Sequence, residues 1–228
     1  MAFDLIVRNG TVVDGTGGSA LRADVGVTGG RITAVGDLAG QQAKRTLDAE
    51  GAVVTPGFVD LHTHYDGQVT WDPDLQPSSV HGVTTAVLGS CGVGFAPCRA
   101  SDRDALIALM EGVEDIPGTA LHEGIRWNWE HFSEYMDFLA SQARTIDVGL
   151  HVPHDALRVF AMGQRGIEGA PANDDDLRAM QAELRAALAA GAMGFSTGRS
   201  DNHRSRSGAP TPAADASRTE LTRSEEHT

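Results

Sequence analysis

The pattern of apolar residues changes at Pro56-Gly57, and this change restricts the possible folds more than any other feature of the chain. Residues 1–56 contain short runs of alternating apolar residues separated by glycine-rich turns such as Asn9-Gly10, which indicate a small antiparallel sheet or half-sandwich. Beyond Gly57, short apolar strands alternate with segments of helical spacing, which is typical of a parallel α/β sheet or barrel. The expected strands are 58–61, 82–89, 147–152 and 192–197, and the expected helices are 101–113, 130–143, 154–162 and 174–190.

The helix expected at 174–190 has the clearest end signals. Asn173 is a favourable N-cap residue, and the three aspartates that follow it lie where the helix dipole favours negative charge. One apolar stripe follows, formed by Leu177, Met180, Leu184 and Leu188. Gly191 stands where a helix commonly ends.

Composition excludes several classes of protein. Eighteen lysines and arginines against thirty-one aspartates and glutamates leave a net charge of −13, which argues against a nucleic-acid binder because such proteins need clustered positive charge. No apolar run reaches the about 18 residues of a membrane span, and residues 1–10 lack the pattern of a secretory signal. The two cysteines, Cys91 and Cys98, are too few for a disulfide framework. We therefore expect a cytoplasmic protein that binds neither nucleic acid nor membrane.

The end of the chain loses the alternating pattern. Residues 199–228 contain almost no large apolar side chain beyond Leu221, so we expect an irregular tail. The last six residues, Arg223–Thr228 (RSEEHT), are what the codons AGA TCG GAA GAG CAC ACG encode, and that string begins a widely used sequencing adapter. We expect these six residues to derive from the adapter and the natural gene to continue; different codons in the underlying nucleotides would remove this argument.

A pair of histidines follows the first strand beyond Gly57. His62 and His64 are two residues apart, so in extended backbone both imidazoles face the same side. This spacing predicts a metal site, because histidine nitrogens are common zinc ligands. Asp60 and Asp66 are close enough in sequence to orient the two rings. The alternative is a pair of solvent-exposed histidines at a strand end.

A cysteine and two further histidines occupy comparable positions after later strands. Cys91 follows the strand 82–89 and is expected at the same end of the sheet as His62. A thiolate there is a good zinc ligand, although a buried, inert cysteine fits the sequence equally well. His154 and His203 follow the next two expected strands, so both are candidates to line the same site.

These residues resemble those of a known family. The run Pro56–His64 (PGFVDLHTH) resembles the motif at the first barrel strand of the amidohydrolase superfamily, and the small sheet before it resembles the composite domain of those proteins. Within the superfamily, the chain is similar to the D-aminoacylases, the N-acyl-D-amino-acid deacylases. The likeness extends from about Met1 to about Leu221, and it is carried by 62–66 (HTHYD), 82–85 (GVTT), 90–92 (SCG) and 191–198 (GAMGFSTG).

The resemblance implies a domain organisation. Residues 1–56 would be the N-terminal β-sandwich part of the composite domain, and 57–198 would be the first half of a metal-dependent-hydrolase (β/α)8 TIM-like barrel. The stretch from Gly57 to Thr222 has 166 residues, against about 250 for a complete barrel. We therefore expect a C-terminally truncated barrel with an open, hydrophobic sheet edge, which would be inactive and poorly soluble by itself.

The resemblance also implies a zinc centre with one or two ions. His62 and His64 would be ligands from the first strand, and Cys91 would be the thiolate that replaces the carboxylated lysine of hydantoinases and dihydropyrimidinases. The fourth expected strand contains no lysine, and the only lysine of the chain, Lys44, lies in the N-terminal sheet, which agrees with a thiolate. Ser196, within that fourth strand, is expected to line the site.

The implied function is hydrolysis of small N-acyl-D-amino acids by metal-activated water. The family takes its general base and two further histidine ligands from later strands, so no catalytic residue is assigned within this chain. Two alternatives stay open: a cyclic-amide hydrolase of the hydantoinase or dihydropyrimidinase type, and a non-catalytic interaction protein derived from a hydrolase half. No pattern in the sequence indicates the oligomeric state.

Overall fold

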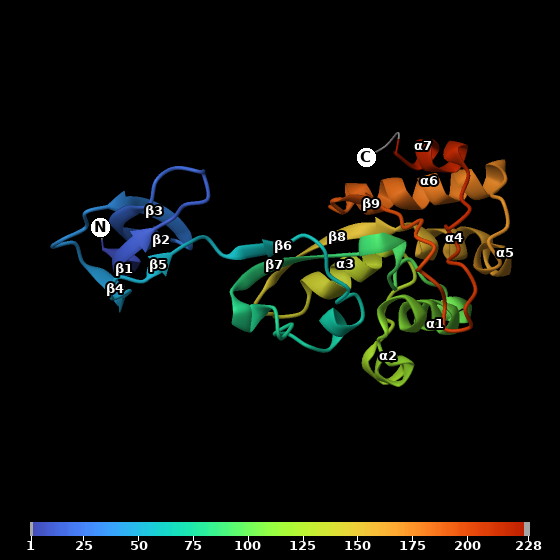
Figure 1. Cartoon of the computed structure of the whole chain (residues 1–228), viewed down its shortest axis with the longest axis horizontal. Helices are drawn as coiled ribbons and strands as arrows, with labels where there is room; N and C mark the ends of the chain where they lie inside the picture. Colours follow the sequence, from blue (N-terminus) through green and yellow to red (C-terminus); the bar gives the residue numbers. More distant parts are fainter. Residues whose placement is uncertain (1, 226–228) are drawn as a thin grey trace. The chain divides into compact units, whose positions relative to one another are not determined.

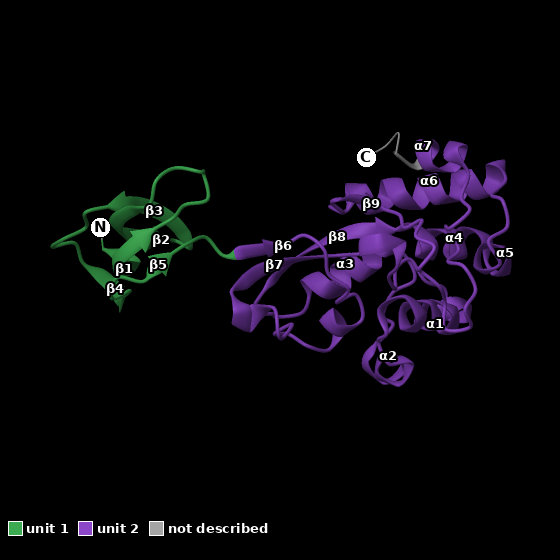
Figure 2. Ribbon diagram, in the orientation of Figure 1, with its two compact units in different colours: residues 1–57 green, residues 58–228 purple. Residues whose placement is uncertain are grey.

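A computed structural model describes residues 2–225 of the chain. The chain divides into two compact units, Met1–Gly57 and Phe58–Thr228 (Figure 2). Each unit has its own sheet, and each is described separately. Among the described residues, no helix is long and apolar enough to cross a membrane.

The first unit is a five-stranded sheet with the order β3-β2-β1-β4, and β5 pairs with β1 beyond this path. Its strands are β1 (Phe3–Val12), β2 (Leu21–Thr28), β3 (Arg31–Gly36), β4 (Ala43–Asp48) and β5 (Val53–Val54). The β1–β2 and β2–β3 pairs are antiparallel as expected, whereas β4 and β5 run parallel to β1, so the sheet is mixed. The physical reason is the connection between β3 and β4, which carries the chain from one edge of the sheet to the other edge, beside β1. It buries Leu38 against Gly26, where an added Cβ would lie 3.0 Å from Leu38 Cδ1.

The second unit contains a four-stranded sheet with the order β6-β7-β8-β9, and all its pairs are parallel (Figure 1). The strands are β6 (Phe58–Asp60), β7 (Val83–Leu88), β8 (Asp147–Pro153) and β9 (Gly194–Ser196). The α-helices are α1 (Arg103–Glu114), α2 (Gly118–Gly124), α3 (Phe132–Ala140), α4 (His154–Met162), α5 (Gln164–Ile167), α6 (Asp174–Ala189) and α7 (Arg218–Glu225). Short 3-10 turns are η1 (Gln68–Thr70), η2 (Ser79–His81), η3 (Ser90–Gly92) and η4 (Ala100–Asp102). This is the strand–helix alternation expected for half of a parallel barrel.

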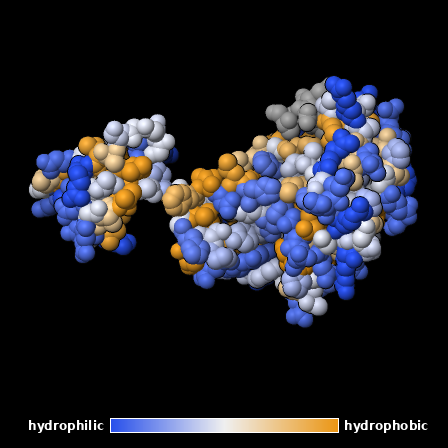
Figure 3. Space-filling view, viewed as in Figure 1, coloured by the Kyte–Doolittle hydropathy of each residue, from blue (hydrophilic) through white to orange (hydrophobic). Residues whose placement is uncertain are grey.

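The second unit has a continuous hydrophobic core, but apolar side chains are exposed in and just after β6. Trp129 and Tyr135 are buried in the core, where Trp129 Nε1 donates to the Phe95 carbonyl at 2.8 Å. Phe58, Val59 and Leu61, in and just after β6, are 59, 55 and 69% exposed. Apolar side chains gather on the surface over this end of the sheet (Figure 3). Parallel sheets are normally covered on both faces, so the exposed apolar side chains indicate an incomplete barrel.

The segment expected to be an irregular tail, residues 199–228, contains one helix: residues 199–217 form no helix or strand, whereas Arg218–Glu225 form α7. Helix α7 lies beside α6, and Ala213, Ala216 and Glu220 are at most 3% exposed (Figure 1). Large apolar residues are scarce here, but small alanines and one buried carboxylate anchor the segment instead. Arg223, the first of the six residues expected to derive from the adapter, is within α7, and residues 226–228 lie outside the described residues.

A buried ionic network connects α7 to α4. Glu220 lies 2.9 Å from His154 Nε2 and accepts from Arg158 Nη1 at 2.6 Å through its second oxygen. All three side chains are at most 1% exposed. Burial raises the pKa of Glu220, but the hydrogen bonds from His154 and Arg158 outweigh this effect and lower it below its usual value. The Glu220 carboxylate therefore provides the hydrogen-bond partner for the buried guanidinium of Arg158 and for the buried imidazole of His154.

Replacement of Glu220 by alanine should strongly destabilise the second unit. The substitution leaves Arg158 buried without its carboxylate, and breaking a buried ion pair in this way costs about 3–5 kcal/mol. Chemical denaturation would measure the loss in the free energy of unfolding. Glu168→Ala, which removes the same charge from an exposed position, should change it by less than about 0.5 kcal/mol; equal effects of the two substitutions would contradict a stabilising role for the network.

Stability should also depend on pH through Asp155. This side chain is fully buried; one oxygen accepts from Ala213 N at 2.6 Å, and the other has no partner among the described residues. Burial raises its pKa to about 7, above the about 4 of an unfolded chain. The stabilisation is therefore complete below pH 4 and is lost as the pH rises through 7, because the folded state binds more protons than the unfolded state.

Substitution of Asp155 by asparagine should reduce this pH dependence. Urea denaturation at pH 5 and pH 8 should show a smaller loss of unfolding free energy in Asp155→Asn than in the wild type. Exposed Asp201, changed to asparagine, is the matched control and should leave the pH dependence unchanged. An identical loss in the wild type and in Asp155→Asn would show that Asp155 is not the titrating group.

Candidate metal centre

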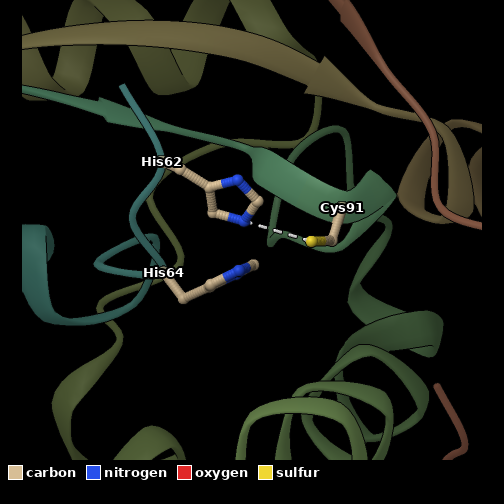
Figure 4. Close-up of side chains that lie close together, drawn as sticks. All are labelled: His62, His64 and Cys91. Atoms are coloured by element: carbon tan, nitrogen blue, oxygen red, sulfur yellow. Dashed lines mark hydrogen bonds between the residues drawn. The ribbon is translucent and has the colours of Figure 1, made fainter. Parts of the chain in front are cut away.

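The structure brings His62, His64 and Cys91 together at one end of the parallel sheet (Figure 4). Both histidines follow β6, and Cys91 is in η3 immediately after β7. One potential ligand atom from each side chain lies within 4.8 Å of the others. The His62 Nε2 and Cys91 Sγ atoms are 3.2 Å apart. The arrangement follows from parallel pairing, because the carboxyl ends of neighbouring parallel strands meet at the same edge.

The two histidines face the same side because the chain stays paired with β7 beyond the end of β6. Both the amide and the hydroxyl of Thr63 donate to the Val87 carbonyl, at 3.0 and 2.8 Å. Thr63 is buried, and its neighbours His62 and His64 both point toward Cys91 (Figure 4). The alternation expected for extended backbone therefore holds at this position.

The turn that carries Cys91 has an unusual backbone. Gly89, Cys91 and Gly92 have φ values of 77°, 55° and 81°, all in the left-handed region. An added Cβ at Gly89 would lie 2.1 Å from the His151 carbonyl oxygen, so no other residue fits without movement of β8. Because of this turn, the chain does not continue in the direction of β7, and the Cys91 thiol points toward His62.

The charges around the cluster suit a cation. Burial, together with the positive charges of His62 and His203, lowers the pKa of His64 to about 4, so its imidazole is neutral at pH 7. His64 Nδ1 is buried and has no hydrogen-bond partner among the described residues. Burial and the carboxylates of Glu114 and Asp66 raise the pKa of the Cys91 thiol. A cation would reverse this shift, because it stabilises a thiolate.

The donor set fits zinc. Two nitrogens and one sulfur are ligands that zinc prefers in proteins. With Zn–N of about 2.0–2.1 Å and Zn–S of about 2.3 Å, tetrahedral ligands are separated by about 3.5 Å. The His62–Cys91 separation of 3.2 Å is close to this value.

Among the described residues, Asp60 and Asp66 bond to backbone amides of the site, and a role for them in orienting the histidine rings stays a prediction. Asp60 Oδ1 accepts from the His62 amide at 3.2 Å. Asp66 Oδ1 accepts from the Gly89 amide at 2.8 Å, two residues before Cys91. Asp66 is buried, and burial is the main reason that its pKa is raised to about 7. Both carboxylates therefore satisfy backbone amides that lie just beyond the ends of β6 and β7.

The remaining candidates are outside the cluster: Ser196 and His203 lie near it, and His154 contacts Thr197, the residue after β9. His154 is fully buried, with Nδ1 2.9 Å from Thr197 Oγ1. Ser196 contacts the turn around Cys91 through its hydroxyl. His203 is close enough that its charge lowers the pKa values of His64 and Glu114, and its Nδ1 is buried without a partner in the described structure.

Sequence reasoning missed Glu114, the last residue of α1. Its Oε1 atom lies 3.2 Å from His64 Nε2, and the two side chains are 21 and 16% exposed. Burial raises the pKa of this carboxyl, and the charges of His203 and His62 oppose that shift. Nothing in the helical pattern of 101–113 indicates such a position, because only tertiary packing directs the end of α1 to the site.

Comparison with known proteins places these residues in a family. Residues 45–224 match the amidohydrolase family. The D-aminoacylase of Alcaligenes xylosoxydans xylosoxydans is 36% identical over 198 residues, covering 86% of this chain and 38% of the relative. The N-acyl-D-glutamate deacylase of the same organism is 38% identical over 196 residues, covering 86% of this chain and 37% of the relative. The chain thus spans less than two fifths of the length of these relatives.

Two solved structures of deacylases are also similar to this chain. N-acyl-D-glutamate deacylase from Bordetella bronchiseptica, complexed with zinc and a phosphonate inhibitor, matches with a TM-score of 0.74 at 36% identity, covering 87% of this chain and 39% of that chain. A D-aminoacylase studied for its binuclear metal centre matches with a TM-score of 0.80 at 37% identity, covering 98% and 42%. With the half-barrel and the family match over residues 45–224, these similarities establish that the chain belongs to the amidohydrolase family.

Proposed function

We propose that this chain contributes the first strands and part of the metal centre of a zinc-dependent hydrolase that removes the acyl group from N-acyl-D-amino acids. The observation that carries the proposal is the His62–His64–Cys91 cluster at the carboxyl ends of β6 and β7. Relatives named D-aminoacylase and N-acyl-D-glutamate deacylase support the substrate class. One or two ions are compatible with the proposal.

The chain's own residues would supply the ligands and hold them in place. His62 and His64 present imidazoles, of which His64 is neutral at pH 7, and Cys91 presents a thiol that becomes a thiolate beside a cation. Asp66 fixes the backbone before Cys91, and Asp60 fixes the amide of His62. Zinc bound there supplies Lewis acidity, which polarises an amide carbonyl and lowers the pKa of a water molecule toward about 7. The general base is proposed to come from a later barrel strand.

Lysine placement favours a deacylase over a cyclic-amide hydrolase. The carboxylated lysine of hydantoinases comes from the fourth barrel strand, and β9 (Gly194–Ser196) has none. The only lysine, Lys44, is in β4 of the first unit and forms an ion pair with Asp4 at 2.7 Å. We also propose a cytoplasmic location and a small-molecule substrate, consistent with two free cysteines and a net charge of −13.

Cys91→Ala should weaken zinc binding. Loss of one of three clustered ligands should lower zinc affinity at least tenfold in a competition titration with a chromophoric chelator. Cys98→Ala is the matched control, because Cys98 is buried away from the cluster and its thiol pKa is raised to about 12, mainly by burial. Unchanged zinc stoichiometry and affinity in Cys91→Ala would remove this residue from the site.

Activity should require more strands than this chain contains. A four-stranded sheet has two unpaired edges, and we expect no release of amino acid from N-acetyl-D-amino acids by the 228-residue chain. A chain extended to an eight-stranded barrel should release D-amino acids and not L-amino acids, and His64→Asn should abolish this release. Measurable turnover by the 228-residue chain, or a preference for L-substrates, would contradict the proposal.

A further inference from the structure

The Ser196 hydroxyl joins the two ends of the turn that carries Cys91. It donates to the Gly89 carbonyl oxygen and accepts from the Gly92 amide at 3.1 Å. These two backbone groups flank Cys91 on either side, and Ser196 is the last residue of β9, more than one hundred residues away in sequence. One side chain therefore uses both its donor and its acceptor to close the Cys91 turn.

The turn needs such support because its backbone is strained. Cys91 has a φ of 55°, in the left-handed region that non-glycine residues rarely adopt. A residue in such a conformation keeps it only when the surrounding structure holds it there. Without that support, the turn would relax and the thiol would leave its position 3.2 Å from His62 Nε2.

The end of β9 packs closely enough to provide this support. A Cβ added at Gly198 would lie 2.2 Å from the Cys91 carbonyl oxygen, and one added at Gly92 would lie 2.9 Å from the Gly198 amide nitrogen. Thr197, the residue after Ser196, is in turn held by His154 Nδ1 at 2.9 Å. The Ser196 hydroxyl therefore belongs to a stretch of backbone whose next residue is bonded to the buried His154.

We propose that Ser196 is a positioning residue that holds Cys91 in its metal-binding conformation. The inference rests on the proposed metal centre for its purpose, while the contact between Ser196 and the Cys91 turn stands independently of it. Two hydroxyl hydrogen bonds across the turn stabilise the left-handed Cys91, and their removal lets the thiol sample other directions.

The test compares Ser196→Thr with Ser196→Val, because these side chains have nearly the same shape and differ in the hydroxyl. The first measurement is the rate at which iodoacetamide alkylates Cys91 in metal-free protein; Cys98 is buried and reacts slowly because its thiol pKa is about 12. Ser196→Thr should react at nearly the wild-type rate, and Ser196→Val should react several times faster. Ser200→Ala, at an exposed position of the following segment, is the control and should behave as wild type.

The second measurement is a cobalt(II) titration that follows the thiolate-to-cobalt charge-transfer absorption. Ser196→Val should bind cobalt 10–100-fold more weakly than the wild type, as expected when a residue that orients a ligand is lost, and Ser196→Thr should restore binding. Thermal unfolding of each variant separates a global loss of stability from a local change at Cys91.

The outcomes distinguish this inference from the proposed function. Equal alkylation rates in Ser196→Val and Ser196→Thr would overturn the role of Ser196, whatever the metal result. If the wild type lacks the charge-transfer band but Ser196→Val still accelerates alkylation, the proposed metal centre fails while the control of Cys91 by Ser196 stands. A lower thermal stability in Ser196→Val without faster alkylation would show a merely structural role and also overturn the inference.

Discussion

The Val87 carbonyl accepts two hydrogen bonds from Thr63, and the candidate site depends on this contact. It extends the pairing of the first strand with β7 beyond the end of β6, and Thr63 is buried while its two histidine neighbours point toward Cys91 (Figure 4). The same parallel pairing brings the end of β7, and hence Cys91, to the edge where the histidines emerge. Without that register, His62 and Cys91 would be two unrelated side chains 29 residues apart.

A series of polar contacts supports this edge of the sheet. Asp66 binds the amide before Cys91, and Ser196 closes the turn from the side of β9. Thr197 and His154 connect that turn to Glu220, whose carboxylate also satisfies Arg158. Residues of α4, β9 and α7 are therefore linked to the turn that carries Cys91. Because His154, Arg158 and Glu220 are buried, the loss of one of these partners would be costly to the other two.

The parts of the fold with local signals were predictable. The helix expected at 174–190 is present as α6, and Asn173 caps it by accepting from the amides of Asp175 and Asp176. The four parallel strands were predictable because their apolar runs are short and separated by helical segments. The tail was not predictable in this way, because its anchors are small alanines and a single glutamate that carry no periodicity. Glu114 was missed for a related reason. It contacts His64 from the end of α1, and the sequence pattern of that helix predicts only which of its residues are apolar and buried.

The sequence by itself determined the class of the second unit, the spacing of His62 and His64, and the presence of a cysteine after the next strand, because these depend on local periodicity and on the order of strands along the chain. Only the tertiary structure decided which carboxylates meet the site and what they bind. Asp60 and Asp66 are near the histidines in sequence but hold backbone amides, whereas Glu114 and Ser196 are distant in sequence and lie against His64 and the Cys91 turn. The physical reason is that hydrogen-bond partners are determined by which groups lie close together in space and by the need to satisfy buried polar groups. A local stretch of sequence shows neither of these.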